Sequence, residues 1–243
     1  MSRIQVPRGS TQAQVNESVF HDLKSVLGES KGLRFMDAPC GEGVFLRFLL
    51  EQFPDSTGTG VEVFRFPAHH PSAKLSYHYA DLSKSFQVGE KHDVVTCISG
   101  VMEFENTSLF LETCRDHLKP GGWIVVTNDS MQMVRDRLSF LFFGKVRRFA
   151  LSLMPGSPTY KCVSIQELHR ILETHGFEVV KIKYTSRRAE DWLALPLALL
   201  LYPFTAILLM REKSKMSLKR RFELFPFLAL LSRHYYLVAR LKA

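Results

Sequence analysis

The most constraining feature of this sequence is a short apolar segment that runs into a glycine-containing loop and then into a longer apolar segment. Residues 33–36 lead to Asp37, Gly41 and Gly43 lie in the loop, and residues 44–53 follow. A short apolar run bounded by turn residues is typical of a buried strand, whereas the longer run is of helical length. The segment therefore predicts a strand, a tight turn and a helix, the unit from which parallel sheets are built.

Strands and helices are predicted to alternate over most of the chain. The ends of two elements are marked, because Ser164 and Glu167 form a capping box and residues 119–122 (Lys-Pro-Gly-Gly) suit a tight turn. This alternation favours one mostly parallel sheet covered by helices on both faces. The apolar patterns predict strands at residues 59–63, 74–79, 93–98, 123–127 and 177–184, and helices at 16–28, 109–118 and 165–175.

The length of the chain fits a single domain. We expect residues 1–243 to form one α/β domain, with a helical lead-in over residues 1–30, a cap insert over 128–160 and a hydrophobic insert over 186–233. The cysteines show no spacing typical of a metal site or a disulfide framework, which favours a reducing compartment. Residues 1–14 are polar and lack the apolar stretch of a secretory signal, so a cytoplasmic location is expected.

The glycine loop is expected to bind a nucleotide-containing cofactor, because ligands of open α/β sheets bind at the carboxyl ends of the strands. A dinucleotide would need a third glycine where this chain has Leu46, and the carboxylate of Glu42 would repel a pyrophosphate. Asp37 and Glu42 suit a cationic cofactor without phosphate, such as S-adenosylmethionine. Glu62, at the end of the second predicted strand, could accept hydrogen bonds from ribose hydroxyls.

Five segments form an ordered set within residues 30–184. They are residues 35–43 (Phe-Met-Asp-Ala-Pro-Cys-Gly-Glu-Gly), 60–62 (Gly-Val-Glu), 80–82 (Ala-Asp-Leu), 92–95 (His-Asp-Val-Val) and 118–122 (Leu-Lys-Pro-Gly-Gly). This set resembles the motifs of class I S-adenosylmethionine-dependent methyltransferases of the small-molecule type. The resemblance implies a Rossmann-like, seven-stranded, mostly parallel sheet whose last strand, residues 234–241, is antiparallel. The hydrophobic helical insert would then lie between strands 6 and 7.

The resemblance also implies which residues surround the S-adenosylmethionine. The loop after the first strand would lie at the methionine moiety, Glu62 at the ribose, residues 81–82 at the adenine and residues 99–101 at the sulfonium. The Cys40 thiol is expected to pack rather than react, because methyl donation needs no thiolate. The full set of predicted cofactor-binding residues is Asp37, Ala38, Cys40, Gly41, Glu42, Gly43, Glu62, Val63, Asp81, Leu82, Ser99 and Gly100.

The acceptor side offers one candidate catalytic residue. Many small-molecule members of the family carry a Glu-His pair after the fourth strand, but this chain has Glu103 followed by phenylalanine, so no base can be carried over. Asp129, directly after the fifth strand, could orient an acceptor, or alternatively cap the following helix. No metal site is expected, since His69, His70 and His78 lack metal-ligand spacing and are interpreted as surface loop residues.

A long uncharged segment in the insert indicates contact with an apolar surface. Residues 192–210 could form a helix of about 28 Å at ~1.5 Å per residue. Residues 211–221 then carry six basic residues and one acidic residue, and residues 222–231 are mostly apolar again. If strands 6 and 7 pair antiparallel, both ends of the insert leave the same sheet edge, so the insert must return. Pro196 and Pro203 favour a broken helix.

Basic residues that alternate with leucine and aromatic blocks favour monotopic attachment to an anionic membrane surface. Lys145, Arg147 and Arg148 would add a second contact. A substrate lid, a dimer core and a two-pass hairpin are the alternatives for the insert.

The formal charge of +8 also fits nucleic acid, but the basic residues lie among aliphatic runs without a basic-aromatic platform. Residues 98–103 also lack the Asn/Asp-Pro-Pro-aromatic motif of methyltransferases that act on amino groups of nucleic bases. We therefore expect a lipophilic acceptor, such as a polyprenyl, quinone-like or lipid-linked molecule, methylated on the inner face of a membrane. An RNA methyltransferase and a membrane-bound, non-catalytic binding protein are the alternatives.

Overall fold

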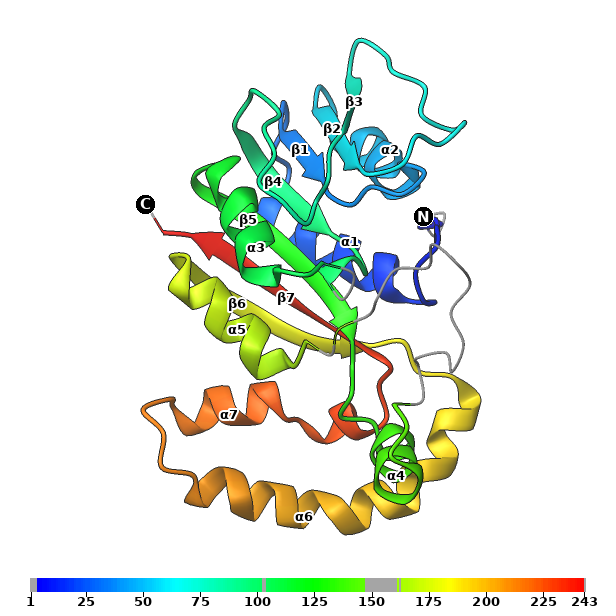
Figure 1. Cartoon of the computed structure of the whole chain (residues 1–243), viewed down its shortest axis with the longest axis vertical. Coiled ribbons are helices and arrows are strands. Elements are labelled where there is room, and N and C mark those ends of the chain that lie inside the picture. Colours follow the sequence, from blue (N-terminus) through cyan, green and yellow to red (C-terminus); the bar gives the residue numbers. More distant parts are fainter. Residues whose placement is uncertain (1–3, 102–103, 147–160, 162, 243) are drawn as a thin grey trace.

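The computed structural model describes residues 4–101, 104–146, 161 and 163–242. Seven strands form one sheet in the order β3-β2-β1-β4-β5-β7-β6 (Figure 1). The prediction of a mostly parallel sheet with an antiparallel last strand is confirmed, because only β7 runs against its two neighbours. The strands are β1 (Arg34–Asp37), β2 (Thr57–Glu62), β3 (Leu75–Tyr79), β4 (His92–Cys97), β5 (Leu118–Asp129), β6 (Phe177–Thr185) and β7 (His234–Leu241).

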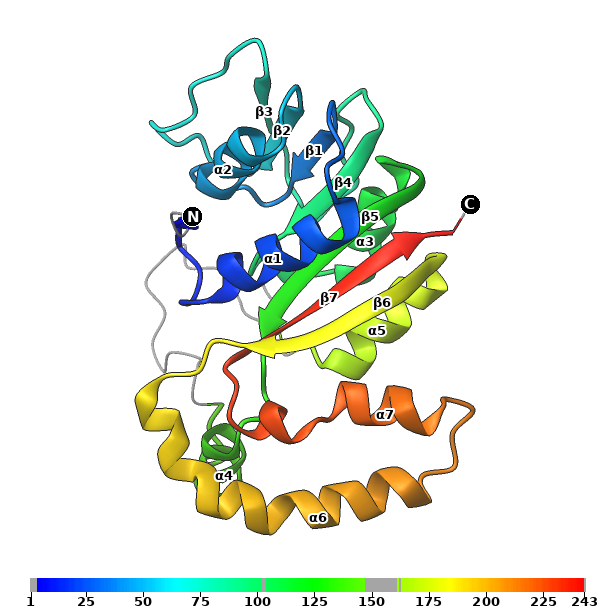
Figure 2. The same ribbon diagram turned by 180° about the vertical axis from the view of Figure 1, so that it is seen from behind.

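Helices cover both faces of the sheet. The helices α1 (Val15–Leu27) and α2 (Val44–Gln52) lie on one face (Figure 2), and α3 (Thr107–Asp116) and α5 (Ile165–Thr174) lie on the other (Figure 1). Each helix buries an apolar stripe against the sheet, for example Leu23 of α1 and Leu49 of α2 in one core cluster. The strand order reverses between β1 and β4, and the carboxyl ends beside such a switch point are where ligands of this architecture bind.

Two local predictions are corrected at the ends of elements. Ser164 caps α5 by accepting a 3.1 Å hydrogen bond from the Glu167 N–H, but the Glu167 carboxylate pairs with Arg170 at 2.7 Å instead of completing a capping box. Residues 119–122 do not form a turn before β5 but a bulge inside it. His92 pairs with Leu118 and Val94 with Trp123, so the bulge lies opposite the single residue between them.

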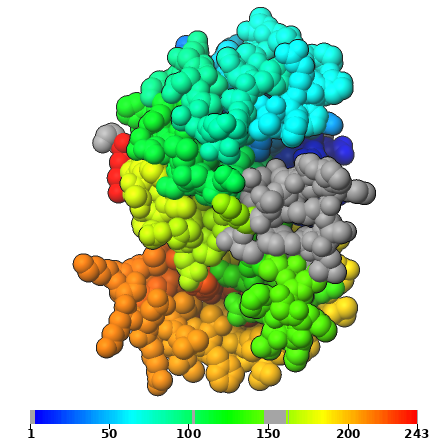
Figure 3. Space-filling view, in the orientation of Figure 1, coloured from blue at the N-terminus to red at the C-terminus, as the bar shows by residue number. Residues whose placement is uncertain are grey.

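The insert between β6 and β7 forms a separate layer below the sheet, seen at the bottom of Figures 1 and 3. It consists of η2 (Ala189–Ala194), α6 (Leu195–Arg211), α7 (Leu218–Leu224) and η3 (Phe227–Leu230). A helix broken at both prolines was predicted. The 3-10 helix η2 gives way to α6 directly before Pro196, but the break at Pro203 is wrong, since α6 continues through it. Pro196 lies in the first turn, where the missing N–H has no helical partner to lose, and the leucine-rich sequence around Pro203 favours helix.

The segment expected to form a cap contributes one helix to the same layer. This helix, α4 (Val134–Phe143), packs through Val134 against Ala198 of α6 and against Leu230 and Leu231. Glu103, Arg147 and Arg148, which entered the sequence-based predictions, lie outside the described residues. In this layer the segment that follows β5 therefore packs against the segment that precedes β7.

Candidate functional site

The loop between β1 and α2 is shaped by two glycines and held by Glu62. Gly41 has a φ of +51° and Gly43 a φ of +73°, conformations that glycine adopts without strain. A Cβ atom on Gly43 would lie 2.5 Å from the Tyr77 hydroxyl, so Tyr77 lies directly against the loop. Glu62 Oε2 accepts a 2.8 Å hydrogen bond from the Gly41 N–H. The carboxyl ends of β1 and β2 are therefore joined at this loop.

Asp37 ends β1 as a buried carboxyl group, 2% exposed. Thr96 of the neighbouring strand β4 donates a 2.6 Å hydrogen bond to Asp37 Oδ1. Burial raises the pKa of Asp37 to about 7; the Thr96 hydrogen bond opposes this rise and the nearby charge of Glu62 adds to it. Glu62 is itself 7% exposed. Two buried carboxyl groups thus converge on the loop, and no cation is among the causes that set the pKa of Asp37.

His69 is not the surface residue that the sequence predicted. It is buried, its Nε2 donates a 2.6 Å hydrogen bond to the Gly41 carbonyl, and its Nδ1 lies 3.1 Å from the Tyr79 hydroxyl. Its ring also stacks on Tyr77, with centroids 4.1 Å apart. The segment after β2 folds back so that these contacts close the outer side of the glycine loop. The other two histidines predicted to lie in surface loops, His70 and His78, are exposed, although His78 lies in β3 rather than in a loop.

Cys40 packs beside the two carboxyl groups. Its thiol is buried, and burial together with the charges of Asp37 and Glu62 raises the pKa of Cys40 well above its usual range. The thiol is therefore protonated at neutral pH, in agreement with the expected packing role. Within the described part of the chain, no group of three metal-ligand side chains converges.

A second polar cluster lies where β4, β5 and β7 meet. Ser99 follows β4 with a φ of +59°, and its N–H donates a 2.8 Å hydrogen bond to Thr127 Oγ1. Ser99 Oγ lies 3.0 Å from His234 Nε2 and 2.8 Å from Thr11 Oγ1. His234 Nδ1 in turn lies 2.8 Å from Asp129 Oδ1. Asp129 therefore pairs with the first residue of β7.

The remaining predicted site residues lie in different surroundings. Asp81 is exposed and accepts hydrogen bonds from Ser83, which with Lys84 lower the pKa of Asp81 to about 2. Leu82 is fully buried in the core, so this predicted cofactor contact is not exposed at the site. A Cβ atom on Gly100 would lie 2.3 Å from Pro39, so these two loops are in direct contact.

Three further predicted residues flank the loop. Ala38 is buried and donates its N–H to the Thr96 carbonyl, which fixes the end of β1 on β4. Val63 is 46% exposed and donates its N–H to Glu62 Oε1. Glu42 is exposed, and its carbonyl accepts a hydrogen bond from Arg47.

Comparisons with known proteins agree with this geometry. A family model described as a methyltransferase domain matches residues 11–182, which is most of the chain. The chain belongs to this methyltransferase family. The sequence-based prediction of a class I, S-adenosylmethionine-dependent methyltransferase is thereby confirmed.

Two curated relatives of the methyltransferase bear the name ubiquinone biosynthesis O-methyltransferase. The protein from Chelativorans sp. is 28% identical over 152 residues, which cover 60% of this chain and 59% of the relative. The protein from Dinoroseobacter shibae is 26% identical over 177 residues, covering 70% of this chain and 69% of the relative.

Solved structures share the fold of the methyltransferase at low sequence identity. An S-adenosylmethionine-dependent methyltransferase from Mesorhizobium loti has a TM-score of 0.58 and 16% identity, covering 93% of this chain and 98% of that chain. Magnesium protoporphyrin IX methyltransferase from Synechocystis, solved with bound SAH, has a TM-score of 0.55 and 14% identity, covering 94% and 82%.

The charges at the glycine loop of the methyltransferase fit a cationic methyl donor. Burying two carboxyl groups close together is costly unless a positive charge compensates them. The raised pKa of Asp37 reports that cost in the protein alone. The α-amino group and the sulfonium of S-adenosylmethionine carry the required charge. The donor set of this site therefore matches the cofactor.

Sequence reasoning missed three residues of the site: His69, Tyr77 and His234. His69 and Tyr77 reach the loop only through the fold, and no spacing in the sequence links them to Gly41. A signal was available for His234, because an antiparallel last strand that begins at residue 234 pairs with the end of β5, and the register places His234 opposite Asp129.

Proposed function

We propose that this methyltransferase transfers a methyl group from S-adenosylmethionine to a hydroxyl group of a lipophilic small molecule at an anionic membrane surface. The acceptor would be polyprenyl, quinone-like or lipid-linked. One observation carries the proposal: the exposed apolar layer is connected to the sheet at the candidate acceptor edge. Its helix α4 follows Asp129 in the sequence, and its other part, the insert, precedes His234. The names of the O-methylating relatives support a hydroxyl acceptor.

On the donor side, the chain's own residues bind and orient. Asp37 and Glu62 would compensate the positive charge of the donor, and the backbone of the Gly41 turn would approach it closely. When bound, S-adenosylmethionine supplies an activated methyl group on a sulfonium. Holding the acceptor oxygen in line with that group accounts for much of the rate acceleration expected from such a site.

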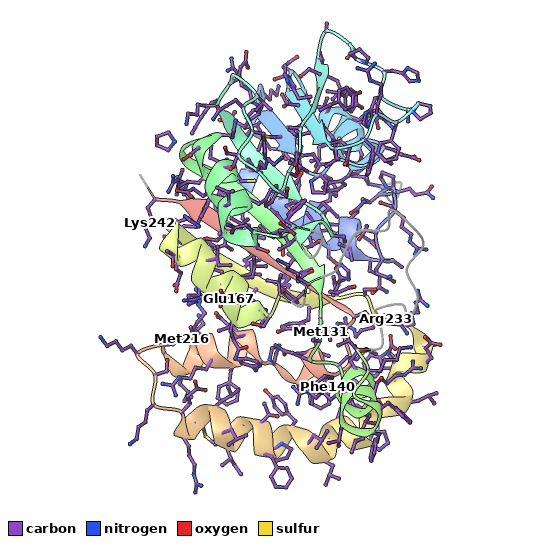
Figure 4. The ribbon with its side chains drawn as sticks, viewed as in Figure 1. Met131, Phe140, Glu167, Met216, Arg233 and Lys242 are labelled. Atoms are coloured by element: carbon purple, nitrogen blue, oxygen red, sulfur yellow. The ribbon has the colours of Figure 1, made fainter. Side chains whose placement is uncertain are left out.

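The apolar layer exposes large side chains that a water-facing surface rarely gathers. On α4, Phe140 to Phe143 are 61%, 73%, 70% and 80% exposed. On α6, Leu200 is 63%, Phe204 62% and Leu208 68% exposed. Figure 4 shows Phe140 on α4 beside α6, in the layer farthest from the sheet. Exposed apolar patches of this kind mark interaction sites, and an acyl-chain boundary is the occupant we propose.

Basic residues of the insert serve either the fold or the exposed rim. Arg221 is used within the protein, since it donates hydrogen bonds to the carbonyls of Leu209, Glu212, Ser214 and Met216 and so closes the end of α6. Arg211, the last residue of α6, is exposed, as are Lys213 and Lys215 just beyond it. The Lys219 side chain is 88% exposed and lies 3.9 Å from Glu223. These four cations at the rim of an apolar patch are suited to anionic headgroups.

The arrangement of the insert favours lying in the interface over crossing the membrane. One helical stretch, Ala189–Arg211, is long and apolar enough to span a bilayer. The insert nevertheless leaves β6 and enters β7 at the paired residues Thr185 and His234, so the chain must return to its starting side. The returning helix α7 has 7 residues and would reach only about 10 Å, against the ~30 Å of a bilayer core.

Flotation with vesicles tests the membrane part of the proposal. We expect the intact chain to float with vesicles of phosphatidylcholine and phosphatidylglycerol and to float much less with phosphatidylcholine alone. The double variant Phe204→Ser, Leu208→Ser should lose flotation, whereas the control Phe64→Ser, which removes an equally exposed ring (68%) far from the layer, should not. If the double variant floats as well as the Phe64→Ser control, the proposed attachment through the apolar layer is contradicted.

The acceptor class is tested separately. A bacterial lipid extract is incubated with the protein and with donor that carries a radiolabelled methyl group. The labelled product should enter the organic phase and should be a methyl ether, which is resistant to acid. A parallel incubation with total bacterial RNA should give no labelled RNA. Label in the RNA, or donor bound without methyl transfer in either incubation, would overturn the proposed acceptor.

A further inference from the structure

Three polar side chains in close contact, Asp129, His234 and Ser99, form a series at the candidate acceptor edge. The three residues come from the end of β5, the start of β7 and the loop after β4. The antiparallel register of β5 and β7 sets Asp129 opposite His234, and the Ser99–Thr127 hydrogen bond holds the loop over β5. Three separate elements therefore fix the geometry of this series.

The contacts define where a proton can go. His234 is 2% exposed, and its Nδ1 lies 2.8 Å from Asp129, a carboxylate that can accept but not donate. The contact is short but not aligned as a hydrogen bond, which is common for catalytic pairs before a ligand binds. A proton on Nδ1 leaves the lone pair on Nε2, and the Ser99 hydroxyl 3.0 Å away can donate to it. Thr11 can then donate to Ser99 Oγ at 2.8 Å.

The position of Ser99 connects this series to the donor side. Ser99 lies three positions after Thr96, which donates to Asp37, so both clusters lie at the carboxyl ends of β1 and β4. The Thr11 hydroxyl contacts Ser99 Oγ at 2.8 Å, and an acceptor hydroxyl that donates to Ser99 would have to replace this contact. Neighbouring charges do not compete for His234, because Arg233 is paired with Asp191 at 2.6 Å and with Glu190.

We propose that His234, oriented by Asp129, is the general base of the methyltransferase and takes the acceptor proton through Ser99. This rests on the proposed hydroxyl acceptor. In the step, a lone pair of the acceptor oxygen forms the new bond to the methyl carbon, and the carbon–sulfur bond of the donor breaks with its electrons staying on sulfur. The acceptor proton moves to Ser99 Oγ as the Ser99 proton moves to His234 Nε2. Asp129 stabilises the resulting imidazolium.

The test compares two aromatic diols that differ in acidity, catechol and 4-nitrocatechol, as acceptors for wild type and the variant His234→Gln. A general base contributes about 100-fold or more for a weakly acidic hydroxyl. Turnover of catechol should therefore fall by about 100-fold in kcat, and turnover of 4-nitrocatechol, which the nitro group makes far more acidic, by less than about 10-fold. Asp129→Asn should show the same pattern more weakly.

The matched control is His175→Gln, which removes a second Ser–His contact, between His175 Nε2 and Ser108 Oγ at 2.9 Å, away from the site. It should change neither acceptor's kcat. Calorimetric titration with S-adenosylmethionine and a thermal melt establish that each variant is folded and binds donor. An equal loss for both diols in a folded, donor-binding His234→Gln protein would overturn the base assignment. Absence of transfer by wild type to either diol and to the lipid extract would instead overturn the proposed hydroxyl acceptor.

Discussion

The substitution Asp37→Asn should stabilise the protein in the absence of ligand, although it removes a residue of the candidate donor site. Asp37 is buried beside Glu62, and burial raises its pKa from 3.8 to about 7. Asparagine has nearly the same shape, can accept the same hydrogen bond from Thr96 and carries no charge to bury. The unfolded chain ionises Asp37 at its ordinary pKa, whereas burial in the folded protein resists this ionisation. Wild type therefore loses stability over the pH range in which only the unfolded chain is ionised.

The pH window and the size of the effect follow from this pKa. Between about pH 4 and pH 7 the folded state binds one more proton than the unfolded state, so the stability of wild type relative to the variant falls with rising pH by about 1.4 kcal/mol per pH unit. The raised pKa of about 7 against 3.8 makes the full difference about 4 kcal/mol at pH 8. That is a large part of the ~5–15 kcal/mol that stabilises a domain.

Urea unfolding followed by circular dichroism between pH 4 and pH 8.5, without ligand, measures this difference. The matched control is Asp22→Asn. Burial alone would raise the pKa of Asp22, but hydrogen bonds from Lys183, Tyr236 and Lys181 lower it below its usual range, so this variant should be less stable than wild type above pH 4. Stability curves for wild type and Asp37→Asn that stay parallel across the range would refute the assignment of a strained, buried carboxyl group.

Three further substitutions test separate parts of the account. Gly43→Ala should lower the free energy of unfolding by about 1–2 kcal/mol, because alanine is strained in the left-handed conformation at φ +73°. By displacing Tyr77 it should also weaken donor binding. Thermal melts and calorimetry measure the two effects, and an unchanged melting temperature would contradict the close approach of Tyr77 to Gly43. Arg233→Ala should lower the free energy of unfolding by about 2–3 kcal/mol in urea titrations, because it removes the two hydrogen bonds from Arg233 to the buried Asp191 carboxylate and leaves only the Arg188 N–H and Arg135 at 3.4 Å. A loss below about 1 kcal/mol would mean that the Arg233–Asp191 pair does not fasten the insert. Glu62→Ala should weaken S-adenosylmethionine binding at least about 10-fold by calorimetry, a loss of ~1.4 kcal/mol; equal affinity would reject its assignment to the ribose.

The ends of the strands were predictable from the sequence because they depend on local patterns. The apolar run before Asp37, the glycines that follow it and the short strand before Glu62 each mark an element boundary within a few residues. Since parallel strands place their carboxyl ends at one edge, the convergence of Asp37 and Glu62 follows from the fold class alone.

The rest depends on contacts between distant segments. His69 looks like a loop residue because no periodic pattern surrounds it, yet stacking on Tyr77 and the hydrogen bond to Gly41 bury it. Residues 119–122 carry turn residues, but the pairing of β5 with β4 on both sides absorbs them as a bulge. Pro203 was expected to break a helix, and the continuous apolar sequence of α6 overrides that local preference.

Calorimetric titration of the intact chain with S-adenosylmethionine measures whether the loop between β1 and α2, with its two buried carboxyl groups, holds a cationic methyl donor. We expect one donor molecule bound per chain, with an affinity that rises from pH 6 to pH 8 as Asp37, whose pKa is about 7, ionises. The Asp37→Asn protein should bind more weakly and lose this pH dependence. Absence of binding by the folded wild-type chain at any of these pH values would contradict the account.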